Sequence, residues 1–261
     1  MLYRPWPGLS RSTRCRSVGL TGRPGSVSRL MNARVQRLCV WGAVVGFLLI
    51  FLGLLVAGWF PIPAAHHTAA YIGRYYRHHA DGIRLGAVLL TAGAALFAPL
   101  AAVTAAHIKR IEGEFSPLAY LELGMGSASA LAISITSFFW WTAAFRPYRD
   151  PVVTQSWNDA GWLCLTAVIF IFNVQLLAIA AAIFTDKQER PLFPRWLGYL
   201  TVWTTVMLLP SLLCLWFKSG AFAWNGAASL YLAFVAVGVW VVALIVNMLR
   251  VIAEQDAALA H

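Results

Sequence analysis

Residues 160–185 read AGWLCLTAVIFIFNVQLLAIAAAIFT, a stretch without a charged side chain that lies between Asp159 and Asp186. An α-helix rises about 1.5 Å per residue, so about 20 apolar residues cross the hydrocarbon core of a bilayer. Backbone groups inside that core must find their hydrogen bonds within the segment, and a helix satisfies them. The stretch therefore predicts a transmembrane helix at 160–184.

The chain has five more charge-free windows, three before this stretch and two after it. Trimmed at prolines and polar turns, the windows predict six helices in all, at 38–60, 84–106, 117–142, 160–184, 196–217 and 227–249. Pro99 and Pro210 predict kinks or local openings in the second and fifth of them. The 261 residues are 60% hydrophobic and only 11% charged, whereas a soluble domain carries about 25% charged residues. We predict an all-α, polytopic six-helix transmembrane bundle rather than a soluble protein.

The orientation of the bundle follows from Lys and Arg in the short loops, because cytoplasmic loops carry more of them. One side receives six of these residues: Arg74, Arg77, Arg84, Arg146, Arg149 and Lys218. The other side, with both termini, receives the remaining 14 of the 20 Lys and Arg residues. This predicts an N-in, C-in topology. Segment 61–84 then forms the first outer loop, in which we expect a short helix lying in the membrane interface.

The segment 1–30 carries six arginines and no acidic residue, so the formal charge of +10 falls to +4 for the rest of the chain. Its prolines and glycines predict a disordered basic tail. Three interpretations stay open: a tail on anionic lipid, a mitochondrial-type targeting peptide, and a translation start at Met31. Residues 31–250 form the six-span domain and 251–261 a short cytoplasmic tail. Because the charge gathers in the tail, we expect no nucleic-acid partner.

Polar side chains recur on one face of the third predicted span, at Glu122, Ser129 and Thr136. At 100° per residue these positions fall within one sector of the helix. An ionisable group inside a bilayer is costly and by default marks a functional site. Glu122 lies about one turn inside the cytoplasmic end. It either snorkels to the interface or serves as a buried carboxyl group linked to a proton or cation.

The fourth predicted span carries Asp159, Thr166 and Asn173 at a spacing of seven residues, with Gln175 beside them. If the polar faces of the third and fourth spans meet, they form a solute lane from Asp159 at the outer rim toward Glu122. The alternative is simple helix association, because such side chains hydrogen-bond between membrane helices for about 1 kcal/mol.

Chemically active side chains gather on the predicted outer side. Eight of them are candidates for an outer mouth: His67, Tyr71, Arg74, His78, Arg146, Arg149, Asp150 and Trp157. On a helix the first four share one face. Aromatic rings and arginines together suit an amphipathic anion, and the alternative is an interfacial aromatic belt with ion pairs that tether the loops. Adjacent histidines point apart on a helix, so we predict no metal and no other cofactor.

Five short motifs carry a resemblance to a family of proteins. They are Lys109-Arg110-Ile111-Glu112-Gly113, Phe145-Arg146-Pro147, Trp157-Asn158-Asp159-Ala160-Gly161-Trp162, Phe193-Pro194-Arg195-Trp196-Leu197-Gly198-Tyr199 and Phe222-Ala223-Trp224-Asn225-Gly226. Through them, residues 37–250 resemble an uncharacterised family of multi-span bacterial inner-membrane proteins of about six helices. The resemblance implies a location in the bacterial inner (cytoplasmic) membrane. It implies no mechanism.

We expect an integral membrane protein that binds or transports a small hydrophobic or amphipathic solute, with the lipid bilayer as its partner, rather than an enzyme. One alternative is a membrane-embedded enzyme with a site of His, Arg and Asp on the outer face. Another is a scaffold subunit of a membrane complex. The sequence leaves open whether a second copy of the chain or another subunit binds to it.

Overall fold

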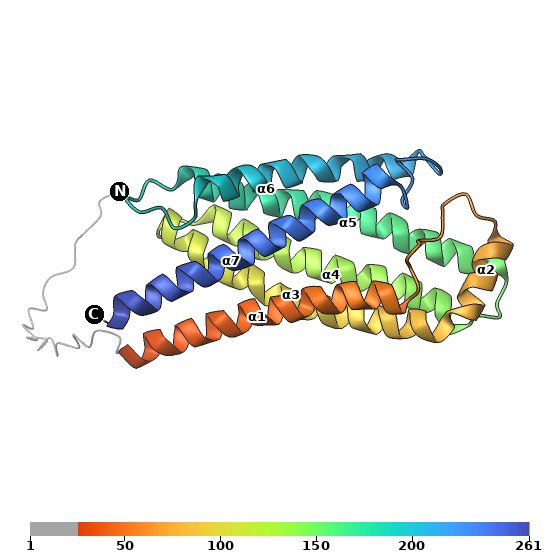
Figure 1. Cartoon of the computed structure of the whole chain (residues 1–261), viewed down its shortest axis with the longest axis horizontal. Coiled ribbons are helices and arrows are strands. Elements are labelled where there is room, and N and C mark those ends of the chain that lie inside the picture. Colours follow the sequence, from red (N-terminus) through yellow and green to blue (C-terminus); the bar gives the residue numbers. More distant parts are fainter. Residues whose placement is uncertain (1–25, 261) are drawn as a thin grey trace, which may run out of the picture.

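The computed structural model describes residues 26–260, with side chains described from residue 33 to residue 258, and every regular element in this part is a helix. The elements are α1 (Ser26–Val56), α2 (Ala69–His78), α3 (Ala80–Glu112), α4 (Pro117–Phe145), α5 (Pro151–Thr185), α6 (Arg195–Leu208), η1 (Leu209–Leu215), η2 (Ala227–Tyr231) and α7 (Leu232–Ala260). Element η1 is a 3-10 helix that continues α6, and η2 is a π-helical turn that precedes α7. Figure 1 shows the long helices side by side in one bundle.

Six helical segments are long and apolar enough to cross a membrane: Ala33–Val56, Ala80–Glu112, Pro117–Phe145, Pro151–Thr185, Arg195–Leu215 and Ala227–Ala258. They confirm the six predicted spans, and the protein is a multi-pass membrane protein. The helices differ from the predicted spans at their ends: the first stops at Val56 instead of 60, and the fourth begins at Pro151 instead of 160. The last helix continues to Ala260, so most of the predicted tail 251–261 belongs to α7. Of the predicted basic tail, residues 1–25 lie outside the described part, and α1 begins at Ser26.

The spanning segments form a closed ring in chain order. Helix α1 packs on α3, α3 on α4, α4 on α5, α5 on α6 and α6 on α7, and α7 returns to α1. Helix α1 begins and α7 ends at one end of the bundle, which we call the chain-end side, and the short helix α2 lies at the opposite end, the α2 side (Figure 1). An ion pair between Arg37 and Asp256 joins α1 and α7 on the chain-end side.

Prolines and acidic side chains start two of the helices. Pro117 and Pro151 occupy first positions of α4 and α5, where the missing N–H has no helical partner in any case. The Asp150 carboxylate accepts a hydrogen bond of 2.8 Å from the first turn of α5. The Glu112 carboxylate accepts two, of 3.2 and 3.0 Å, from the first turn of α4. These acids satisfy unpaired N–H groups and complement the positive ends of the helix dipoles.

Four glycines bring the backbones of α1 and α3 into direct contact, which we call the glycine seam. A Cβ atom at Gly46 would lie 2.6 Å from the carbonyl oxygen of Gly93, and one at Gly93 would lie 2.5 Å from the carbonyl oxygen of Gly46. Gly53 and Gly86 repeat this reciprocal contact, at 2.7 and 2.5 Å. Small residues permit such close approach, and close packing drives helix association in lipid because the lipid tails are themselves apolar.

The fifth and sixth spans leave regular α-helical geometry on the α2 side. Pro210 lies at the start of η1, where the sequence predicts a local opening, whereas α3 continues as one helix through Pro99. The Ser211 hydroxyl donates to the carbonyl oxygen of Ser229, and the Ser229 hydroxyl donates to that of Phe222 at 2.9 Å. Hydroxyl groups thus supply hydrogen bonds to backbone carbonyls at the break, where water is scarce.

Replacing Gly93 by Ala is expected to destabilise the protein, because the added methyl group meets the backbone of α1 and overpacking costs about 1–3 kcal/mol. Gly238→Ala is the matched control. Nothing lies within 4 Å of a Cβ atom at Gly238, and Ala is favoured over Gly in a helix by about 1 kcal/mol. Thermal unfolding followed by circular dichroism should give a lower midpoint for Gly93→Ala only. A Gly93→Ala protein as stable as the wild type would disprove the seam.

Candidate functional site

A cavity of about 520 Å³ lies at the centre of the ring. Every spanning segment contributes to its wall, and most of the lining residues are apolar. On α4 the lining positions extend from Glu122 to Trp140, which at about 1.5 Å per residue corresponds to a length of about 27 Å. The cavity is therefore elongated and covers most of the thickness of a hydrocarbon core of about 30 Å.

One carboxyl group lies in the wall near the chain-end side. Only 1% of Glu122 is exposed, and its Oε1 accepts a hydrogen bond of 3.1 Å from Nε2 of Gln175. The Ser129 hydroxyl donates to Oε1 of Gln175 at 3.4 Å. Among the described residues, Oε2 of Glu122 has no hydrogen-bond partner, and no Lys, Arg or His lines the cavity. Glu122 is a buried acid with one free acceptor atom and no basic side chain in the surrounding wall.

Gly126 makes room for this carboxyl-amide pair. A Cβ atom there would lie 2.9 Å from Nε2 of Gln175 and 2.4 Å from Cβ of Ala101 on α3. The missing side chain lets the amide of Gln175 cross the surface of α4 and reach Glu122. A glycine one turn after the acid is therefore part of the site, although it carries no functional group.

Four of the six predicted lane residues line the cavity: Glu122, Ser129, Thr136 and Thr166. Asp159 and Asn173 do not, and Gln175 lines the wall instead. The lining stripe of α5 passes through Phe172 and Gln175, which are three residues apart. Because successive residues of a helix differ by about 100° in direction, Asn173 points elsewhere. The polar lane therefore does not extend to the outer rim at Asp159.

Asp159 belongs to a separate network between α2 and α5. Its Oδ1 accepts a hydrogen bond of 3.1 Å from Nδ2 of Asn158, and Oδ1 of Asn158 accepts one of 3.0 Å from the Tyr76 hydroxyl. Tyr76 and Asn158 are fully buried, and burial raises the pKa of Tyr76 well above its usual range. The phenol therefore stays a neutral donor at physiological pH, and the network fastens α2 to the bundle.

Four tryptophans pack at the α2 side of the cavity, and we call them the Trp cluster: Trp59, Trp140, Trp162 and Trp224. The ring centroids of Trp59 and Trp140 lie 4.3 Å apart, and Trp162 lies 4.8 Å from Trp140 and 6.4 Å from Trp224. All four are buried. Nε1 of Trp224 donates to the carbonyl oxygen of Pro63 at 2.9 Å, while the other three indole nitrogens have no partner among the described residues. The cluster closes the α2 end of the cavity.

The helix breaks add three polar wall residues that the sequence analysis does not identify: Ser211, Cys214 and Ser229. The Thr166 hydroxyl oxygen lies 3.2 Å from Sγ of Cys214. The only signal for this patch in the sequence is Pro210, which opens the fifth span next to Ser211. Nothing in the sequence shows that the sixth span opens opposite it.

The predicted outer-mouth residues lie on the α2 side, and none of the eight lines the central cavity. His67 precedes α2 and so does not share a helix face with Tyr71, although the two rings stack with centroids 3.9 Å apart. Asp150 starts α5, and Trp157 stacks on Phe139 at 5.9 Å. The others are exposed or half-exposed side chains: Arg74, His78, Arg146 and Arg149. A common mouth for an anion stays a prediction.

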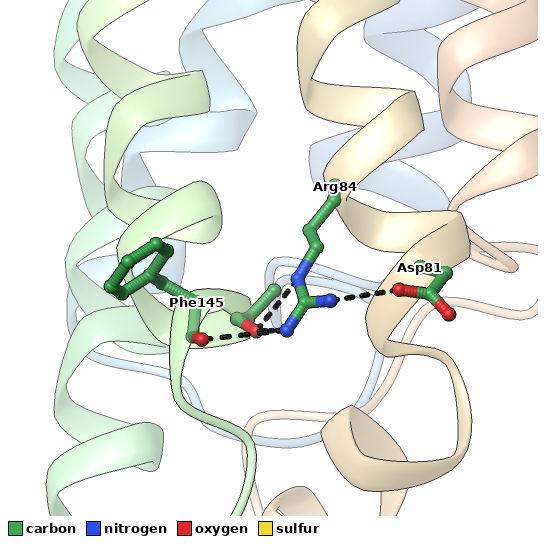
Figure 2. A network of polar contacts seen from close by, with 4 residues as sticks. Asp81, Arg84 and Phe145 are labelled. Carbon is green, nitrogen blue, oxygen red and sulfur yellow. Dashed lines mark hydrogen bonds and ion pairs between the residues drawn. The ribbon is translucent and has the colours of Figure 1, made fainter.

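Figure 2 shows how an arginine of α3 holds the end of α4 on the α2 side. Arg84 donates to the carbonyl oxygen of Ala144 at 3.2 and 3.0 Å and to that of Phe145 at 3.4 Å, and it pairs with Asp81 at 2.8 Å. A cation at a helix C-terminus satisfies free carbonyls and complements the dipole. Among the described residues, no group of three His, Cys, Asp or Glu side chains is placed to hold a metal ion.

Replacing Gln175 by Leu is expected to destabilise the protein, because it removes the one hydrogen bond that the buried Glu122 carboxyl group receives from the described residues, and an unsatisfied buried group costs about 1–3 kcal/mol. Asn173→Leu, two residues away on the same helix, is the control. Oδ1 of Asn173 has no partner to lose, so its replacement should leave the thermal midpoint unchanged or raise it. If Asn173→Leu proved the more damaging substitution, the assignment of Gln175 to the site would be wrong.

No protein-family model, curated protein or solved structure matches this chain. A functional conclusion therefore rests on the chemistry of the cavity wall. Its decisive features are an elongated apolar surface, one buried acid near the chain-end side and an aromatic closure at the opposite end.

Proposed function

We propose that the protein binds a small hydrophobic or amphipathic solute in its central cavity and transports it. The observation that supports this most is the cavity itself, about 520 Å³ of mostly apolar space with the free Oε2 of Glu122 in its wall. Ligand sites in proteins have volumes of about 300–1,000 Å³, apolar walls and a few placed polar groups. A solute with an apolar body and one polar end satisfies both parts of this wall.

The solute enters from the lipid, between α1 and α7. Two lining residues of α1, Leu48 and Phe51, are 60% and 50% exposed, which supports an opening of the cavity beside α1. Helices α1 and α7 lie close together near the chain ends and diverge toward the α2 side (Figure 1). The Trp cluster closes the cavity at the α2 end. A molecule dissolved in the bilayer therefore enters through the opening between α1 and α7.

A hydrophobic photolabel tests access to the cavity. Vesicles containing the protein are irradiated with an iodophenyl diazirine, and labelled residues are mapped by mass spectrometry. Ile133 and Leu165 line the cavity, so the diazirine should label them. Excess decanol should compete with the diazirine for the cavity and lower this labelling. Thr136→Phe fills the cavity and should lower their labelling about tenfold, as expected when about 1.4 kcal/mol of binding is lost. Ile135→Phe, at a lipid-facing neighbour 43% exposed, should not. Unlabelled cavity residues in the wild type would count against the proposal.

We also propose that the chain-end side faces the cytoplasm and that the membrane is the bacterial inner membrane. The excess of Lys and Arg on the termini's side supports the orientation, and the family resemblance supports the membrane. Glu122 then lies nearer the cytoplasm than the outer surface.

Cysteines placed on opposite sides test this orientation. In a background without the native cysteines, His66→Cys on the α2 side should react with a membrane-impermeant maleimide in intact cells. Glu189→Cys, between α5 and α6, should react only after lysis. Both positions are exposed, so accessibility does not limit either reaction. The reverse pattern of labelling would overturn the assignment.

A further inference from the structure

The polar end of the central cavity contains an acidic side chain but no basic one among the described residues. Glu122 is 1% exposed, its Oε1 is engaged by Gln175 and its Oε2 has no partner among the described residues. In the part of the chain that the structure describes, no basic side chain lines the cavity. Among the described residues, Glu122 thus supplies the one carboxyl group in the cavity wall.

We propose that the solute is a single-chain amphiphile with a protonated amine as its head group, held at Glu122. The apolar chain extends along the cavity from this head group toward the Trp cluster. The proposal rests on the function proposed above and names the class of solute that this site takes.

The shape of the cavity favours a chain. Its lining extends along α4 from Glu122 to Trp140, a length of about 27 Å at about 1.5 Å per residue. A volume of about 520 Å³ spread over this length is narrow. It fits one extended hydrocarbon chain better than a compact ring system, and the acid at one end of the lining fixes the direction in which the chain lies.

The charge of the cavity favours an amine. An ionised carboxylate buried in an apolar wall requires a counter-charge and hydrogen-bond donors. In the described part of the chain, the Glu122 carboxyl group accepts one hydrogen bond, from Gln175, and no cationic side chain lines the cavity. An ammonium group supplies the positive charge and a donor for Oε2 together. Phe172 lies one turn from Gln175 in the same wall, and aromatic faces stabilise cations further. A carboxylate head group would meet like charge at Glu122.

Tryptophan fluorescence measures the binding of matched bromine-labelled chains. The protein in nanodiscs of neutral lipid is titrated with ω-bromohexadecylamine, ω-bromohexadecanol and ω-bromohexadecanoic acid. Trp140, Trp162 and Trp224 line the cavity, so bromine at the end of a bound chain should quench their emission in a saturable way. We expect the amine to bind at least about tenfold more tightly than the alcohol or the acid, the ratio that corresponds to about 1.4 kcal/mol.

Glu122→Gln keeps the shape of the side chain and removes its charge. It should weaken amine binding about tenfold and leave alcohol binding within about twofold. Glu114→Gln is the matched control, because Glu114 is exposed in the loop before α4 and does not line the cavity. It should bind all three compounds as the wild type does.

The outcomes distinguish the assignment of an amine head group from the more general proposal that the cavity binds a solute. If no compound quenches in a saturable way, the solute-binding function fails. If amine and alcohol bind the wild type equally, or if Glu122→Gln binds the amine normally, solute binding stands and the amine assignment is overturned. If Glu122→Gln does not fold, as judged by gel filtration and circular dichroism, the comparison of the three compounds on the wild type decides alone.

Discussion

The glycine seam between α1 and α3 is the contact on which the open side of the cavity depends. At both glycine pairs a carbonyl oxygen of the facing helix lies 2.5–2.7 Å from the position of a Cβ atom, so a side chain at any of the four positions would clash with the facing backbone. Helix α1 is thereby fixed against α3, and Figure 1 shows it departing from α7 toward the α2 side. On α1, Leu48 and Phe51 both line the cavity and stay half-exposed or more. A backbone contact on one flank of α1 thus sets the opening on its other flank.

An empty centre costs stability, because atoms along an unfilled wall lose their dispersion partners. The bundle offsets this loss with dense packing at its two ends. On the α2 side the four residues of the Trp cluster belong to one apolar core. Toward the chain-end side a second core includes Leu176, Leu197 and Met248. The two cores stabilise the ring of helices at its two ends, so the side chains in the middle can line a cavity and need not fill it.

The six helices follow from the sequence because charges are too costly in hydrocarbon to interrupt a span. The helical period also places Glu122, Ser129 and Thr136 on one face, and all three line the cavity. The period does not reveal which neighbour a face meets, so it favours Asn173 for a position that Gln175 occupies. The glycine pairs recur every seven residues in both helices, a regularity visible in the sequence, but their meeting depends on how α1 and α3 are aligned. Contacts between helices, rather than patterns within them, are what the sequence leaves undetermined.

Ring closure has a consequence for how the protein is made. Five of the six contacts in the ring join spans that follow one another in the chain, and only that of α7 with α1, near the Arg37–Asp256 ion pair, joins its distant ends. Synthesis proceeds from the N-terminus, so the ring closes only after α7, the last of these six spans, has been made. Until then the future cavity wall is in contact with lipid. A solute of the proposed kind would then compete with lipid chains for the same apolar wall.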